Sequence, residues 1–114
     1  MPDPRRAFGT DGEDQAAAWY EARGYEVLDR NWRCRAGELD LVVRSGDTLA
    51  FVEVKARRTA RFGIPAEAVT PAKQARLRTL AMEYLQGRGL RARTLRFDVV
   101  SILGGELEAI EGAF

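Results

Sequence analysis

The chain has 114 residues, of which 46% are hydrophobic and 31% charged, so its composition predicts one globular domain and leaves no room for a second core. No apolar run is long enough to cross a bilayer, and residues 1–6 lack the apolar stretch of a signal peptide, so we expect a cytoplasmic protein without membrane association. The sequence contains no histidine and a single cysteine, Cys34, which excludes histidine-based catalysis, most zinc sites and an internal disulfide.

The positive charge is carried mainly by arginine. Of the 18 basic residues, only Lys55 and Lys73 are lysines, and the net charge is +1. Guanidinium groups suit contacts with phosphate, so clustered arginines predict a basic face despite near neutrality. An arginine-rich composition also arises from genome composition or thermal adaptation, and this alternative stays open.

The first part of the chain predicts a tail, a helix and a strand. Residues 1–8 are expected to form a flexible N-terminal tail, and residues 9–114 a single domain. A helix is predicted over residues 12–23, with Asp11 as its N-cap and Gly24 after its last turn. The alternation of residues 25–33 then predicts a strand.

The rest of the chain predicts a hairpin, a second helix and one or two further strands. Residues 38–44 and 48–55 form the hairpin around the Gly46-Asp47 turn, and residues 56–64 form a basic loop. A helix opened by Thr70 and Pro71 follows. Residues 94–103 are apolar on both sides and therefore predict a central strand, with a short last strand over residues 106–110. The order α-β-β-β-α-β predicts the α/β class, as a single-domain mixed β-sheet flanked by helices.

The hairpin turn predicts which side chains face one another. With Ser45 opposite Thr48, Asp40 lies opposite Glu53 and Glu38 lies opposite Lys55. Side chains two residues apart on a strand point the same way. One polar patch is therefore expected, formed by Glu38, Asp40, Glu53 and Lys55. The apolar residues of the two strands are expected to fill the other face: Leu39, Leu41, Val43, Val52 and Val54.

Directly opposed carboxylates repel one another, and a divalent cation between Asp40 and Glu53 would relieve this conflict. Without histidine the ligands are mainly oxygens, which indicates Mg²⁺ or Mn²⁺. Lys55 would stabilise charge on a reacting phosphate or orient the attacking water, Glu38 belongs to the same catalytic patch, and Glu13 is a candidate further ligand. In the alternative, Glu38 and Lys55 form an ordinary ion pair, Asp40 and Glu53 are solvated, and Glu13 is a partner of the helix dipole.

A second group of residues is a candidate for nucleic-acid binding. Trp32 either stacks on a base or belongs to the core, where strand tryptophans more often lie. Polar residues of the second helix either contact phosphates along a nucleic-acid strand or form an ordinary solvated helix face. The candidate nucleic-acid-binding residues are Arg33, Arg35, Arg57, Arg58, Lys73, Gln74 and Arg76.

Asp40 followed by Glu53-Val54-Lys55 resembles the split Asp…Glu-x-Lys motif of the restriction-endonuclease-like nuclease superfamily. From about Gly9 to Phe114 the chain also resembles the YraN-like family of bacterial proteins. This resemblance implies a restriction-endonuclease-like core related to archaeal Holliday-junction resolvases. It implies Asp40 and Glu53 as metal ligands, Lys55 as the catalytic lysine and Glu13 as the glutamate that completes the site. The segments that carry it include Gly12-Glu13-Asp14, Gly37-Glu38-Leu39-Asp40-Leu41, Phe51-Val52-Glu53-Val54-Lys55-Ala56-Arg57, Lys73-Gln74 and Arg96-Phe97-Asp98-Val99-Val100.

The leading functional hypothesis is a Mg²⁺- or Mn²⁺-dependent endonuclease that acts on DNA, with branched or junction DNA as the expected substrate. A second hypothesis is a nucleic-acid-binding module of the same fold that does not cut. A third is a protein-interaction role in which the acidic patch is structural. A homodimer would suit a junction with two equivalent strands, but the sequence leaves the oligomeric state open.

Overall fold

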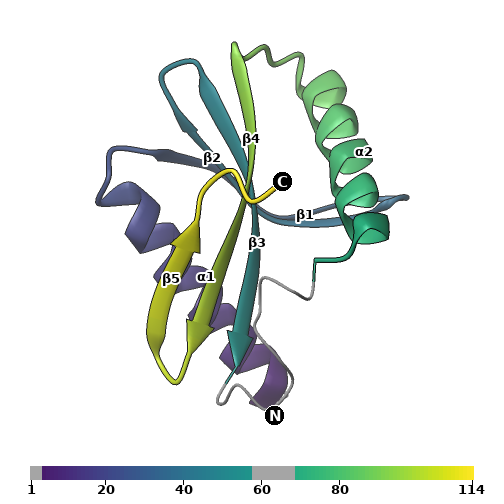
Figure 1. Cartoon of the computed structure of the whole chain (residues 1–114). Helices are drawn as coiled ribbons and strands as arrows, with labels where there is room; N and C mark the ends of the chain where they lie inside the picture. The colour runs from purple at the N-terminus through teal and green to yellow at the C-terminus, as the bar shows by residue number, and fades with distance from the viewer. Residues whose placement is uncertain (1–3, 58–68) are drawn as a thin grey trace.

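A five-stranded mixed sheet with two helices forms the protein, as shown by the computed structural model, which describes residues 4–57 and 69–114 (Figure 1). The predicted α/β class and the predicted order of elements are confirmed. The elements are α1 (Pro4–Glu21), β1 (Glu26–Cys34), β2 (Gly37–Ser45), β3 (Thr48–Arg57), α2 (Pro71–Arg88), β4 (Thr94–Leu103) and β5 (Glu106–Ile110).

The strands lie in the order β1-β2-β3-β4-β5. Among the strands that the structure describes, only β3 and β4 are parallel, and the chain between them includes α2. The other neighbours are antiparallel. The β2–β3 hairpin pairs Ser45 with Thr48 and continues to Leu41 opposite Val52, which confirms the predicted register over this part. β4 lies between β3 and β5 and is buried from Asp98 to Ile102, as predicted for a central strand.

Each face of the sheet is covered by one helix, and each side has its own apolar core (Figure 1). Over the described residues, neither helix is long and apolar enough to cross a membrane. On the α2 side the ring of Trp32 packs edge-on against Tyr84 at 5.3 Å, so Trp32 is partly buried against this core. The α2 side buries Leu39, Val42, Leu49, Phe51, Val69, Leu77, Leu80, Ala81, Tyr84 and Val99, and the α1 side buries Ala16, Ala17, Tyr20, Leu41, Val43, Ala50, Val52, Val100 and Ile102.

Helix α1 begins at Pro4, earlier than predicted, so residues 4–8 are helical and Asp11 lies inside the helix instead of capping it. Proline is favoured at the first helical position, and one interior glycine costs only about 1 kcal/mol, so Gly9 and Gly12 do not end the helix. Glu13 therefore lies well beyond the first turn. This position excludes the alternative that Glu13 is a partner of the helix dipole, because that effect is confined to the first turn.

At Gly12, helix α1 lies directly against β3. A Cβ atom built on Gly12 would lie 2.8 Å from the Cβ of Ala56, closer than two carbon atoms can approach. The absent side chain thus lets the helix rest on the end of β3 that carries Glu53 and Lys55. Because Glu13 is the next residue, this contact also sets the position of its carboxylate.

We predict that Gly12→Ala destabilises the protein by about 1–3 kcal/mol, because the strain of overpacking exceeds the gain in helix propensity. Thermal or urea denaturation measures the effect. The matched control is Gly87→Ala in α2, where nothing lies within 4 Å of the added atom. This control should be neutral or stabilising by up to about 1 kcal/mol. Equal stability of the two variants would contradict the close contact.

Candidate functional site

The candidate site lies where β2 separates from β3. Paired residues end at Leu41 and Val52, one pair short of the predicted Asp40–Glu53 pair. Asp40 instead uses its side chain, because its Oδ2 accepts a hydrogen bond from the backbone N–H of Val54 at 2.9 Å. The carboxylate thus takes the place of a strand partner at the point of separation.

The alternation of side chains in β2 changes at the same point. Leu39 and Val42 pack in the core beneath α2, whereas Leu41 and Val43 pack in the core beneath α1. The prediction that Leu39 shares a face with Leu41 is therefore wrong. A regular strand would place both on one side, so the backbone must change course around Asp40.

The neighbouring strand β1 is also irregular here. Asn31 lies between the pairs Arg30–Leu41 and Trp32–Leu39, across from Asp40, and has a left-handed backbone with φ 53°. Asparagine tolerates this conformation better than most residues. The Nδ2 of Asn31 donates to Oε2 of Glu13 at 2.8 Å, and the next residue of α1, Asp14, pairs with Arg30. These two contacts attach α1 to β1 and place Glu13 beside the point of separation.

Glu53 is the buried carboxylate of the site, and both lysines of the chain contact it. Only 7% of Glu53 is exposed. Its Oε1 lies 3.1 Å from Nζ of Lys55 and 2.6 Å from Nζ of Lys73. Lys73 comes from the first turn of α2, where Oγ1 of Thr70 accepts a hydrogen bond from its backbone N–H. A buried charge needs such partners, because the loss of hydration is otherwise uncompensated.

The sequence predicts phosphate binding for Lys73 and does not predict its contact with Glu53. Nothing in the local pattern of α2 shows which strand residue its first turn meets. A useful signal was available in the composition, since an arginine-rich chain keeps only two lysines. The lysine ammonium group is compact and sits on a flexible stem. Two ammonium groups can therefore contact one carboxylate oxygen, whereas two planar guanidinium groups would clash with each other there.

Several charged groups lie close together in the site, and they shift one another's pKa values. Burial, and next the charge of Glu53, raise the pKa of the Asp40 carboxyl from its ordinary 3.8 to about 7, although the Val54 hydrogen bond opposes this. Glu13 and Glu38 add smaller contributions in the same direction. Burial and the nearby Lys73 ammonium lower the pKa of Lys55. For Lys73, burial is the largest single effect and opposes the charged form, but the hydrogen bonds to Glu53 and Lys55 and the charges of Glu53 and Asp40 together raise its pKa.

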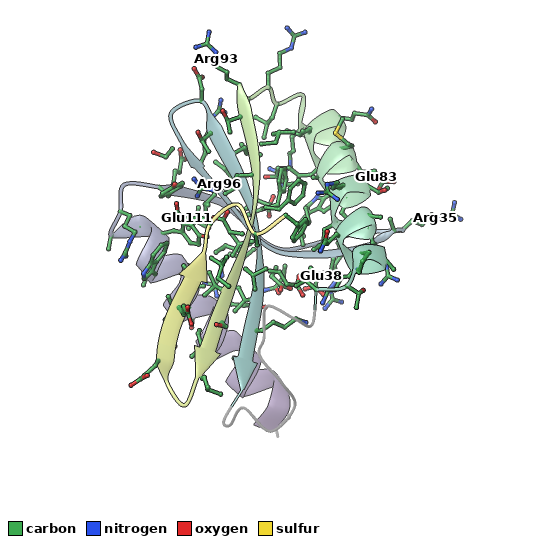
Figure 2. All side chains as sticks on the ribbon, viewed as in Figure 1. Arg35, Glu38, Glu83, Arg93, Arg96 and Glu111 are labelled. Atoms are coloured by element: carbon green, nitrogen blue, oxygen red, sulfur yellow. The ribbon has the colours of Figure 1, made fainter. Side chains whose placement is uncertain are left out.

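Glu38 does not face Lys55 as predicted, because the β2–β3 pairs have ended before this point. It lies opposite Arg33 on β1, and Oε2 of Glu38 is 3.5 Å from Nε of Arg33. Figure 2 shows Glu38 near the start of α2, and Arg35 pointing away from the molecule beyond α2. Glu38 therefore acts on Asp40 only through its charge, whereas Arg35 is free to meet a partner.

The remaining candidate residues fall into three groups. Gln74 is structural, since its Nε2 donates to the backbone oxygen of Val69 at 3.1 Å and so holds the start of α2. Arg76 is exposed on α2 and lies beside Gly37. The side chain of Arg57, all of Arg58 and most of the predicted basic loop lie outside the described residues.

The donor set fits a hard divalent cation. Among the residues that the structure describes, no three acidic or cysteine side chains gather as a metal site on their own. Asp40 and Glu53 are nevertheless two carboxylates within electrostatic reach of each other. Mg²⁺ commonly uses one or two carboxylates and completes its shell with water and substrate phosphates. These two residues would hold the ion, and Glu13 lies near enough for its charge to act on Asp40.

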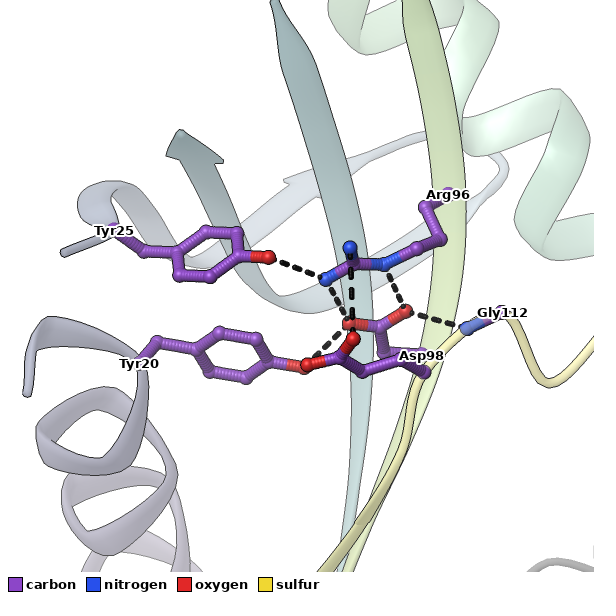
Figure 3. A network of polar contacts seen from close by, with 6 residues as sticks. Tyr20, Tyr25, Arg96, Asp98 and Gly112 are labelled. Carbon is purple, nitrogen blue, oxygen red and sulfur yellow. Dashed lines mark hydrogen bonds and ion pairs between the residues drawn. The ribbon is translucent and has the colours of Figure 1, made fainter. Parts of the chain in front are cut away.

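A second buried polar cluster holds the C-terminal segment and is separate from this site (Figure 3). Asp98 is 1% exposed and accepts hydrogen bonds from the hydroxyl of Tyr20, from two nitrogens of Arg96 and from the backbone of Gly112. Arg96 also donates to the hydroxyl of Tyr25. Each member has a partner, so the cluster joins α1, β4 and the C-terminal segment as a structural network.

Together these features define a small mixed α/β domain with a buried carboxylate–lysine cluster at the point where two strands separate. The sequence matches the family described as "Uncharacterised protein family UPF0102" over residues 12–102, and the chain belongs to this family. A UPF0102 protein of Beutenbergia cavernae is 56% identical over 97 residues, covering 85% of this chain and 82% of the relative. One of Rhodococcus jostii is 49% identical over 113 residues, covering 95% and 96%. One of Myxococcus xanthus is 47% identical over 117 residues, covering 99% and 93%.

The raised pKa of Asp40 predicts a pH dependence of stability in metal-free protein. Between about pH 4 and pH 7 the folded protein keeps a proton that the unfolded chain releases, so Asp40 contributes less stability as the pH rises. The loss is at most about 1.4 kcal/mol per pH unit. Asp40→Asn cannot ionise and should gain stability relative to wild type across this range, measured by urea denaturation in EDTA. If the difference in free energy of unfolding between Asp40→Asn and wild type stays constant from about pH 4 to pH 7, the raised pKa of Asp40 is contradicted.

Proposed function

We propose that the chain is a Mg²⁺- or Mn²⁺-dependent endonuclease that hydrolyses phosphodiester bonds in DNA, with branched or junction DNA as the substrate class. The single observation that supports this most strongly is the arrangement around Glu53. A buried carboxylate lies beside a second carboxylate of raised pKa and contacts two lysine ammonium groups. Asp98, the other buried carboxylate among the described residues, is paired with Arg96. Local conflict inside an otherwise consistent domain is typical of functional sites.

The residues suit hydrolysis of a phosphodiester. A divalent ion held by Asp40 and Glu53 would polarise the phosphoryl oxygen and activate a bound water. Lys55 extends from β3 two residues beyond Glu53, so its amine reaches the same space and can stabilise negative charge on the phosphate or orient the attacking water. Water adds to phosphorus, the bond to the leaving sugar oxygen breaks, and that oxygen takes up a proton.

Contacts with the rest of a nucleic acid would come from arginines near the site. The side chain of Arg33 is 73% exposed, and Arg35 points outward at the end of the β1–β2 hairpin (Figure 2). Arg76 is exposed on α2 next to the same hairpin. Guanidinium groups in such positions suit the phosphates of a strand that crosses the site, and binding would weaken as the salt concentration rises.

A second candidate function is a nucleic-acid-binding module that does not cut. It is favoured by the two ammonium groups on Glu53, which already neutralise the carboxylate that a metal would need. Such a module would bind DNA with a steep salt dependence and release no cleavage product with either metal.

We predict that Lys55→Ala lowers the cleavage rate on the order of 10²- to 10³-fold, because one charged donor to the reacting phosphate is lost. Plasmid, single-stranded, flap and four-way-junction DNA, each tested with Mg²⁺ and Mn²⁺, would provide the measurement. The control is Arg91→Ala, which removes one positive charge beyond the opposite end of β3, near Thr94. A Lys55→Ala variant as active as wild type would contradict the proposed mechanism.

A further inference from the structure

We propose that Lys73 is an internal cation that occupies Glu53 in the metal-free protein and must leave this carboxylate before a divalent ion can bind. The inference rests on the proposed function, since it concerns the same two carboxylates. It assigns Lys73 a role that differs from general phosphate binding: the residue sets the affinity of the site for metal.

The geometry places Lys73 where a ligand ion would lie. Its Nζ is 2.6 Å from Oε1 of Glu53, closer than the 3.1 Å of Lys55. The Glu53 side chain is 8% exposed, whereas the Lys73 side chain is 29% exposed and borders solvent. The charge of Asp40 also acts on Lys73. One ammonium group is therefore attracted by both predicted metal ligands.

A divalent ion and this ammonium group exclude each other. If an ion bound the same oxygen of Glu53, two like charges would lie within about 4 Å in a partly buried site, where water screens their repulsion only weakly. Glu53 gains a stronger partner when the metal binds, so it no longer needs Lys73 to compensate its burial. Replacement of Lys73 by the divalent ion therefore costs less free energy than removal of Lys73 with no new cation at Glu53.

Lys73 is better suited to leave than Lys55. Lys55 belongs to β3, two residues from Glu53 on the same strand, and its position follows from the pairing of β3 with β4. Lys73 belongs to a different element and lies in the first turn of α2, where the helix dipole disfavours a cation. Its flexible stem lets the ammonium group turn toward solvent, where the phosphate of a bound substrate would replace Glu53 as its partner.

The test measures Mn²⁺ binding by isothermal titration calorimetry in the absence of DNA, so that it does not depend on activity. Lys73→Met keeps the apolar stem and removes the charge, and we expect it to bind Mn²⁺ on the order of tenfold more tightly than wild type. Lys73→Gln, which can still donate a hydrogen bond to Glu53, should also bind more tightly and provides a second variant if Lys73→Met does not fold. Arg91→Met makes the same change of net charge away from the site and should leave the affinity unchanged.

The outcomes separate the two proposals. Tighter binding by either Lys73 variant, with no change in Arg91→Met, supports the exchange. Equal or weaker binding by the Lys73 variants, while wild type binds Mn²⁺, would overturn the role of Lys73 and leave the proposed function intact. Absence of Mn²⁺ binding in wild type and in all variants would contradict the proposed function itself, and the inference would fall with it.

Discussion

Glu53 is a carboxylate that folding removes from water, and this burial requires a compensating cation in the folded protein. The strand that carries it is held by β4 on one side but loses β2 on the other, because pairing with β2 stops at Val52. Glu53 lies directly after the last pair, and the side chain of Asp40 takes the place of a backbone partner there. The separation of two strands thus creates the site and fixes its charge.

The rest of the site follows from that constraint. Helix α2 begins where Lys73 can reach Glu53, and helix α1 crosses β3 so closely at Gly12 that Glu13 comes to rest near Asp40. Both helices therefore contribute charge to the same point through contacts that also hold them on the sheet. Stability and the charge of the site are coupled here, since removal of Glu53 would leave two ammonium groups without the carboxylate that they share.

The sequence predicted the elements well because their signals are local: an apolar period, a Gly46-Asp47 turn and a Thr70 N-cap were enough to define the hairpin and α2. The start of α1 was missed because helix-breaking and helix-starting residues compete within a few positions. The site residues Asp40, Glu53 and Lys55 came from strand periodicity. Their true arrangement could not be predicted, because the change of course at Asp40 depends on a backbone irregularity across two strands, and the contact of Lys73 depends on how α2 packs.

The central claim, that the separated strands present Asp40 and Glu53 to a divalent ion, is tested most directly by anomalous diffraction from a crystal of the full chain soaked in Mn²⁺. We expect an anomalous peak within coordination distance of both carboxylates, with the ammonium group of Lys73 no longer on Glu53. An unoccupied position between the two carboxylates, with Lys73 still bound to Glu53 at saturating Mn²⁺, would contradict it.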